Sequence, residues 1–310
     1  MKAPDEIRAA ALALAANFEL TSTERAERLT LALDPAYWRG LSPAIQISPG
    51  DLFDSHRIPL HEQEEIERHF TRERYFATPP LIPPSVLSRM NATIDAVRAA
   101  GWPPVFAMVS DDFWHCGRLD TIARVLRARL GPGYRQVPHY WVHIVRAVDG
   151  AAGWLPHFDG LMNGRVSVWM ALVDATIENG CIYLVPPNLL PESFRTLKLE
   201  SVPMIDVARA MHATRPLPAA AGSALGWDFD VFHWGGRAVN PRGERRAISM
   251  EFIAASEPPL GHELPLIDLD GSLPTLNQRL HAIGLGLDQY ARREPTAQRY
   301  LGLARDLMEL

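Results

Sequence analysis

The chain has 310 residues, of which 47% are hydrophobic and 22% charged, a composition typical of a globular protein with a full core. A net charge of −5 argues against nucleic acid as a partner, because surfaces that bind nucleic acid are basic. The two cysteines, Cys116 and Cys181, form no CxxC pair and indicate no disulfide framework. No run approaches the roughly 20 apolar residues that cross a bilayer, so we expect a cytoplasmic protein without membrane contact.

Residues 1–131 are expected to be mainly helical. An Ala- and Leu-rich stretch at residues 1–20 has charged residues just before its apolar run, which favours an amphipathic helix over a secretion signal. Thr21 and Pro84 are typical helix starts, and His61–Phe76 has dense charges around spaced apolar residues.

Residues 132–256 change to short β-branched and aromatic runs that are separated by turn residues. The expected strands are Tyr140–Val145, Val166–Val173, Cys181–Val185, Ala224–Phe229 and Ala247–Ile253. Several short strands in succession are typical of a jelly roll. Residues 257–310 return to helices, which could pack on the strands or form a dimer contact. We therefore expect one mainly β domain, a double-stranded β-helix (jelly-roll or cupin-like) core wrapped by N- and C-terminal helices, as a monomer or homodimer.

The strongest local feature is His157-Phe158-Asp159, with His233 far downstream. In an extended strand, residues two apart point to the same face, so His157 and Asp159 would project together. A third ligand from a distant strand would complete two histidines and one carboxylate, the facial triad of non-haem Fe(II) oxygenases. Taken alone, an HxD is equally compatible with a surface turn.

The surroundings of both halves resemble the phytanoyl-CoA dioxygenase family. That family shows an HxD, then a strand and turn like residues 168–180, a strand like residues 181–187, and later a histidine followed by an R-x-A-I-S-like strand. The resemblance runs from about Trp154 to Phe252 with all elements in order. It departs at residues 185–188, where Val-Pro-Pro-Asn replaces the family's iPgSH, so an unusual substrate is expected.

The resemblance implies an iron(II)- and 2-oxoglutarate-dependent dioxygenase that uses O2, with His157, Asp159 and His233 as metal ligands. It also implies that Arg245 binds the distal carboxylate of 2-oxoglutarate. A guanidinium suits that task, because it is always charged and can bind a carboxylate through two hydrogen bonds. A register slip of one residue would select Arg246 instead.

Further residues on the same strands are candidates for the pocket. Ser249 lies four residues after Arg245, on the same strand face, and could support the cosubstrate. Trp169 is expected as a wall beside the cosubstrate, although a core aromatic is an equal alternative. Trp141 and His143 alternate on the strand before the HxD and could line the substrate pocket.

The implied reaction is hydroxylation of an aliphatic C–H of a small organic molecule, with release of succinate and CO2. Related halogenases replace the carboxylate of the triad with a small residue, so Asp159 favours hydroxylation over halogenation. Residues 188–218 could form a lid over the pocket. Their basic residues suggest an anionic substrate, and a solvated loop is the alternative.

Two other classes of function stay open. A cupin-like metalloenzyme would use the same triad without 2-oxoglutarate, which leaves Arg245 without a role. A catalytically silent family member would bind a ligand or a partner instead.

Overall fold

The computed structural model describes residues 19–47, 52–239, 241–291 and 293–310. The amphipathic helix expected at the N-terminus falls on residues 1–18, which lie outside the described residues, and on the two positions that follow. Within the described ranges, no helix has the length and apolar character needed to cross a bilayer.

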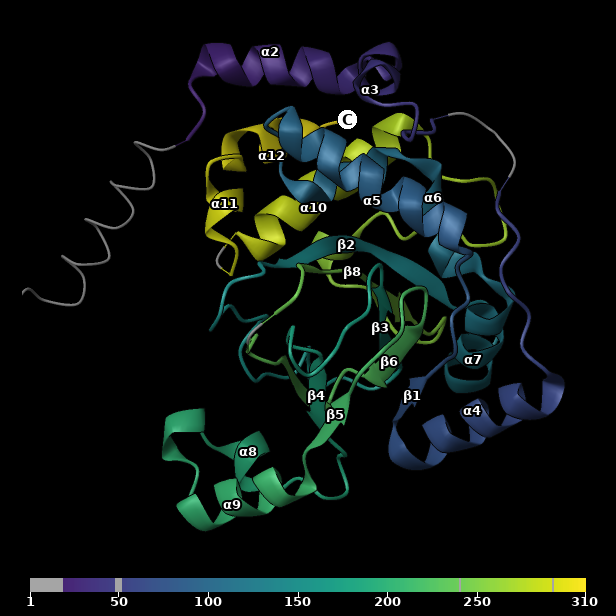
Figure 1. Ribbon diagram of the computed structural model, residues 1–310, viewed down its shortest axis with the longest axis vertical. Coiled ribbons are helices and arrows are strands. Elements are labelled where there is room, and N and C mark those ends of the chain that lie inside the picture. The colour runs from purple at the N-terminus through teal and green to yellow at the C-terminus, as the bar shows by residue number, and fades with distance from the viewer. Residues whose placement is uncertain (1–18, 48–51, 240, 292) are drawn as a thin grey trace, which may run out of the picture.

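Two antiparallel sheets form the centre of the molecule (Figure 1). The larger sheet has the order β1 (Tyr75–Ala77), β6 (Ala224–Asp228), β3 (Arg165–Ala171), β8 (Arg245–Ile253) and β2 (Arg135–Val145). The smaller sheet has the order β5 (Arg215–Leu217), β4 (Ile182–Val185) and β7 (Phe232–Gly235). Each strand expected from the sequence is present with slightly different bounds, and β1 adds a strand to the part expected to be helical.

Strand β8, an inner strand of the larger sheet, separates two environments by its alternation. Ile248 and Phe252 are fully buried in the apolar cluster shared with the helices. Arg245, Ser249 and Glu251 point to the opposite face, toward a cavity. Because successive side chains of a strand point to opposite faces, one sequence builds both the helix-packed layer and the cavity wall.

The two sheets pack face to face around a second apolar cluster. The larger sheet contributes Trp169, Leu225 and Ala247, and the smaller sheet contributes Ile182 and Leu184. This cluster closes one end of the space between the sheets, and the cavity occupies what remains of that space.

Helices cover the outer face of the larger sheet (Figure 1). They are α2 (Ser22–Leu33), α3 (Pro35–Leu41), α4 (Leu60–Glu73), α5 (Pro84–Ala99), α6 (Asp111–His115), α7 (Asp120–Leu130), α10 (Leu276–Tyr290), α11 (Pro295–Gln298) and α12 (Leu301–Met308). Short 3-10 turns lie at Pro104–Val109, Cys116–Arg118 and Gly261–Glu263. Leu303 and Leu307 of α12 are fully buried against the main core, which is the packing that the sequence favoured for this helix.

The segment expected as a lid folds into a small helical insertion below the smaller sheet (Figure 1). It contains α8 (Ser193–Thr196), a 3-10 turn at Leu199–Ser201 and α9 (Met204–Ala213). Phe194 of α8 packs with Phe232 of β7, with ring centroids 5.2 Å apart. The insertion is therefore attached to the strand that carries His233.

A buried ion pair fastens the chain after β8 to the larger sheet. Arg165 at the start of β3 binds both carboxylate oxygens of Glu263, and the two side chains are 2% and 4% exposed. Glu263 also accepts the backbone N–H of Leu260 at 2.7 Å. The pair fixes the connection that leads from β8 into helix α10.

Removing one partner of this ion pair should destabilise the protein strongly. Arg165→Met should lower the free energy of unfolding by about 3–5 kcal/mol, because Glu263 would be left as an uncompensated buried charge. The double variant Arg165→Met/Glu263→Leu should recover most of that loss. Urea denaturation measures both values, and a double variant as unstable as the single one would contradict this account.

Candidate metal centre

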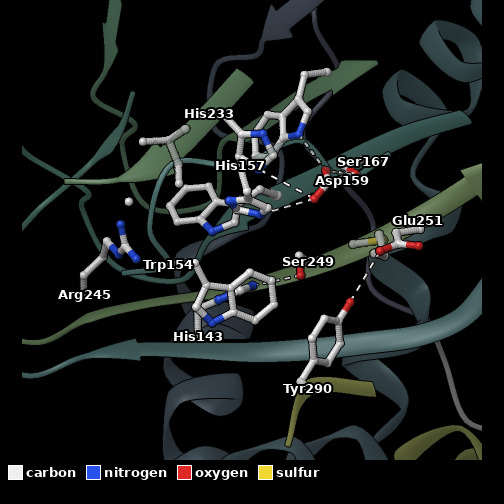
Figure 2. A pocket seen from close by; sticks show the side chains of 15 residues that line it. His143, Trp154, His157, Asp159, Ser167, His233, Arg245, Ser249, Glu251 and Tyr290 are labelled. Carbon is white, nitrogen blue, oxygen red and sulfur yellow. Dashed lines mark hydrogen bonds and ion pairs between the residues drawn. The ribbon is translucent and has the colours of Figure 1, made fainter. Parts of the chain in front are cut away.

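His157, Asp159 and His233 lie together at the mouth of the cavity (Figure 2). Their ligand atoms are all within 4.8 Å of one another. Asp159 Oδ1 lies 3.5 Å from His157 Nε2 and 3.7 Å from His233 Nε2. The structure thus brings the three residues selected from the sequence into a set with metal-binding spacing.

The HxD lies in an irregular segment, and not in the strand that the sequence suggested. His157 is held by an isolated antiparallel bridge to His233, in which each backbone N–H donates to the other carbonyl at 3.0 Å. The bridge between Ala152 and Arg237 and the hydrogen bond from Gly235 N–H to the Trp154 carbonyl at 3.1 Å add to this pairing and place the HxD beside β7.

Backbone carbonyls orient both histidine rings. His157 Nδ1 donates to the Leu155 carbonyl at 2.7 Å, and His233 Nδ1 donates to the Val231 carbonyl at 2.9 Å. A carbonyl can only accept, so each Nδ1 carries the proton and each Nε2 presents a lone pair. Among the described residues, the buried His157 Nε2 has no hydrogen-bond partner, as expected for an atom that ligates a metal.

Asp159 is held as a carboxylate by its neighbours. Its Oδ2 accepts the Ser167 hydroxyl at 2.6 Å and the Trp227 indole N–H at 3.0 Å. Burial raises the pKa of Asp159, but the positive potential of His233 and His157 and the hydrogen bonds lower it further, so the net pKa lies well below the usual range. Oδ1 remains directed at the two histidines.

Arg245 lies on the other side of the cavity with its guanidinium buried. Arg245 is 2% exposed and donates to the Gly180 carbonyl. Its Cζ atom lies over the Trp169 ring, 5.7 Å from the ring centroid. Burial lowers its pKa to about 10, so it stays charged at neutral pH. Within the described ranges no carboxylate pairs with it, and its Nε has no hydrogen-bond partner.

Two glycines allow the backbone to lie close to this guanidinium, because neither has a Cβ. A Cβ on Gly153 would lie 2.7 Å from Arg245 Nη2, and a Cβ on Gly235 would lie 3.2 Å from the same atom. A side chain at either position would therefore collide with Arg245 or displace it.

Arg246 points away from the cavity. It forms ion pairs with Asp95 at 2.8 Å and with Glu244 at 3.0 Å. The alternative considered from the sequence was a register slip of one residue that selects Arg246 as the cosubstrate anchor. That side chain lies outside the cavity, and two carboxylates already neutralise it.

The other candidates divide into two groups. Trp169, His143 and Ser249 line the cavity, and His143 Nε2 lies 2.8 Å from the Ser249 hydroxyl. Burial, followed by the Arg245 charge, lowers the pKa of His143 to about 3, so this ring is neutral. Trp141 was expected to line the cavity, but it does not. It lies behind Tyr290, with ring centroids 4.9 Å apart.

Trp154 stands in the cavity between the two ends of β8 (Figure 2). Its ring lies 4.7 Å from His143 and 4.9 Å from Tyr290, and its indole N–H donates to Glu294 at 2.9 Å. Hollows open on both sides of this ring. One adjoins Arg245, and the other adjoins Glu251.

Several functional positions were not selected from the sequence. Ser167 and Glu251 share strand faces with Trp169 and Ser249, so the period-two rule that selected the latter pair could have found them. Trp154, Trp227 and Tyr290 come from separate elements and gave no such signal.

The basic residues of residues 188–218 do not reach the cavity. Three of them pair elsewhere with carboxylates: Arg195 with Asp230, Arg209 with Asp206 and Arg215 with Glu73. These residues therefore do not line this cavity, and an anionic substrate stays a prediction.

Comparison with solved structures identifies the fold. The chain superposes on "non-heme alpha ketoglutarate dependent epimerase SnoN" with a TM-score of 0.50 and 17% identity, covering 64% of this chain and 85% of that one. It superposes on the carbocyclase SnoK with a TM-score of 0.53 and 14% identity, covering 71% of this chain and 100% of that one. It superposes on the non-heme monooxygenase ThoJ in its nickel complex with a TM-score of 0.54 and 17% identity, covering 76% of this chain and 100% of that one. These likenesses show a shared fold.

The comparison with curated protein sequences gives no significant match. The comparison with family models gives one, to phytanoyl-CoA dioxygenase (PhyH), over residues 152–247. This stretch contains His157, Asp159, His233 and Arg245. The segment that builds the metal centre thus matches the model of the family that its sequence motifs resemble.

Proposed function

We propose that the protein is a non-haem iron(II)- and 2-oxoglutarate-dependent dioxygenase built on a double-stranded β-helix. The observation that carries the proposal is the buried Arg245 guanidinium, which shares one cavity with the triad and has no carboxylate partner among the described residues. A buried cation without a counter-charge is costly, so this position calls for an anionic ligand.

The residues fit the two groups. His157, Asp159 and His233 offer two imidazole nitrogens and one carboxylate oxygen, the donor set of Fe(II) oxygenases. Arg245 lines the same cavity with a buried guanidinium that has no carboxylate partner among the described residues, which fits one carboxylate of a dicarboxylic acid. In a related fold, a SnoN structure is described as a complex with Fe3+, alpha ketoglutarate and nogalamycin RO.

The iron centre would supply O2 activation coupled to decarboxylation of 2-oxoglutarate and oxidation of a substrate C–H, with release of succinate and CO2. The chain's own residues prepare this chemistry. Ser167 and Trp227 keep Asp159 ionised and aimed at the metal position, and the backbone carbonyls keep both Nε2 atoms unprotonated. The walls of Trp169 and Trp154 restrict water around the site.

We further propose that the reaction is hydroxylation of an aliphatic C–H. Asp159 occupies the carboxylate position of the triad, and this leaves no small residue there to make room for a halide. The named activities of the fold relatives differ, so the outcome in each would depend on the substrate's position and not on the triad. A cytoplasmic location and a monomeric or dimeric state stay predictions.

The role of Arg245 can be tested against its neighbour. Arg245→Met should raise the dissociation constant for 2-oxoglutarate at least about 30-fold, because losing one partner of a buried charge pair costs about 2–5 kcal/mol. Arg246→Met is the matched control and should change it less than about twofold, since the Arg246 side chain pairs with Asp95 and Glu244 and does not line the cavity. The measurement is the visible charge-transfer band of anaerobic protein titrated with 2-oxoglutarate after Fe(II).

If both variants bound 2-oxoglutarate like the wild type, Arg245 would have no role in binding the cosubstrate. If the wild type bound iron but gave no charge-transfer band with 2-oxoglutarate, the cupin-like alternative would replace this proposal. If iron itself did not bind, the enzyme assignment would fall, and the catalytically silent alternative would lead.

A second test concerns the support of Asp159. Ser167→Ala should weaken Fe(II) binding about 10- to 100-fold, the usual effect of removing a hydrogen bond to a metal ligand. Ser193→Ala is the control, because it removes a serine–aspartate hydrogen bond of 2.8 Å outside the cavity, to Asp206. Anaerobic equilibrium dialysis gives both affinities, and equal affinities in the two variants would refute the assigned role of Ser167.

A further inference from the structure

The cavity is polarised along strand β8. Arg245 and Glu251 both line it, and six residues, or about 20 Å of extended chain, separate them. Figure 2 shows the two side chains on opposite sides of the triad. Since Arg245 is assigned to the cosubstrate, the Glu251 end is left for the molecule that is oxidised.

Glu251 has few partners of its own. The Tyr290 hydroxyl donates to its Oε1 at a long 3.4 Å. In the part of the chain that the structure describes, no arginine, lysine or histidine pairs with it. The nearby Arg165 is engaged by Glu263. Burial, with added repulsion from Asp159 and Glu263, raises the pKa of Glu251 to about 8. The carboxyl is therefore largely protonated at neutral pH, and a cation placed beside it would lower this pKa and stabilise the ionised form.

The hollow that opens beside Glu251 is acidic. It is lined by Trp154, Asp159, Glu251, Asp288, Gln289, Tyr290 and Arg293. Arg293 lies 5.1 Å from the Trp154 ring and forms no ion pair with Glu251. Even with Asp159 assigned to the metal, two carboxyl groups, those of Glu251 and Asp288, face the single guanidinium of Arg293. A positively charged ligand is therefore favoured over an anion in this hollow.

We propose that Glu251, supported by the Tyr290 hydroxyl, anchors the substrate, and that the substrate carries an ammonium or similar cationic group next to the C–H that is oxidised. This inference deepens the proposed function and rests on it for the assignment of the Arg245 end to 2-oxoglutarate. It replaces the anionic substrate suggested by the basic residues of residues 188–218, which pair outside the cavity.

The test compares three probes of the same length and different charge. n-Hexylammonium, 1-hexanol and hexanoate are titrated calorimetrically into the full chain, metal-free and again with Fe(II) and 2-oxoglutarate under anaerobic conditions. We expect hexylammonium to bind about 10- to 100-fold more tightly than hexanol in both states, the range of a hydrogen bond to a charged group. We expect hexanoate to bind most weakly in the protein loaded with Fe(II) and 2-oxoglutarate, where the cosubstrate occupies Arg245. Tighter binding of hexanol, tighter binding of hexanoate to the loaded protein, or equal binding of all three to the loaded protein would overturn the proposal.

Two variants assign the preference to one residue. Glu251→Gln keeps the shape and hydrogen bonding but removes the charge, so the preference for hexylammonium should fall to within about twofold. Glu257→Gln, at a carboxylate that lines none of the cavities described, should keep it. A preference that survives Glu251→Gln would show that the anchor lies elsewhere and would overturn the assignment.

Folding and function are separated by the same measurements. Glu251→Gln should melt no lower than the wild type, because the carboxylate charge is disfavoured by burial at this position. The comparison of the three probes on the wild type stands even without that variant. If the ammonium preference holds in metal-free protein while the charge-transfer band is absent, the iron and 2-oxoglutarate proposal fails and the cation site stands.

Discussion

The constraint on which the site depends is the charge of Arg245. A guanidinium does not lose its proton under physiological conditions, so a side chain that is 2% exposed must receive its compensation from within the protein or from a ligand. Among the described residues, Arg245 has only the Gly180 carbonyl and the face of Trp169. Both are weak substitutes for a carboxylate. The folded chain thus retains an uncompensated cation where it is useful, a few side chains from the metal-binding triad.

The period-two geometry of strands arranges the rest of the cavity around this cation. On β8, the alternation that sends Ile248 into the helix-packed core brings Arg245, Ser249 and Glu251 to the cavity. On β3, Ser167 faces the cavity beside Trp169 by the same rule. A register shift of one residue would exchange the two faces, burying polar groups in the core and apolar ones in the site. The packing of the large helical core therefore also fixes the register of the active-site residues.

The same rule explains how far the sequence could predict the site. The choice of Arg245 over Arg246 followed from the motif register of the family that the sequence resembles, since alternation shows only that one of the two can face the cavity. The structure places only Arg245 at the cavity. The strands and most helices were predictable because their apolar residues repeat with a clear period. The triad was predictable because the HxD and the downstream histidine stand in an ordered set of motifs that resembles the phytanoyl-CoA dioxygenase family, although the HxD lies in an irregular segment.

What the sequence could not provide is the meeting of separate elements. Trp154 comes from a loop and Tyr290 from the end of α10, and nothing in their local sequences indicates that they touch. Trp141 was expected in the pocket because it alternates with His143 on the same strand face. Tyr290 of helix α10 lies against Trp141 and separates it from the cavity. Long-range packing of this kind depends on the whole fold.

The order of charges along the cavity has a consequence for ligand selection. A dicarboxylate at the Glu251 end would meet the repulsion of Glu251 and Asp288, while a cation at the Arg245 end would meet a buried guanidinium. Trp154 stands between the two ends, so each ligand faces its own hollow on one side of that ring. Cosubstrate and substrate are then sorted by the field of the protein before either reaches the metal. Strand β8, with Arg245 and Glu251 six residues apart, is sufficient to set that field.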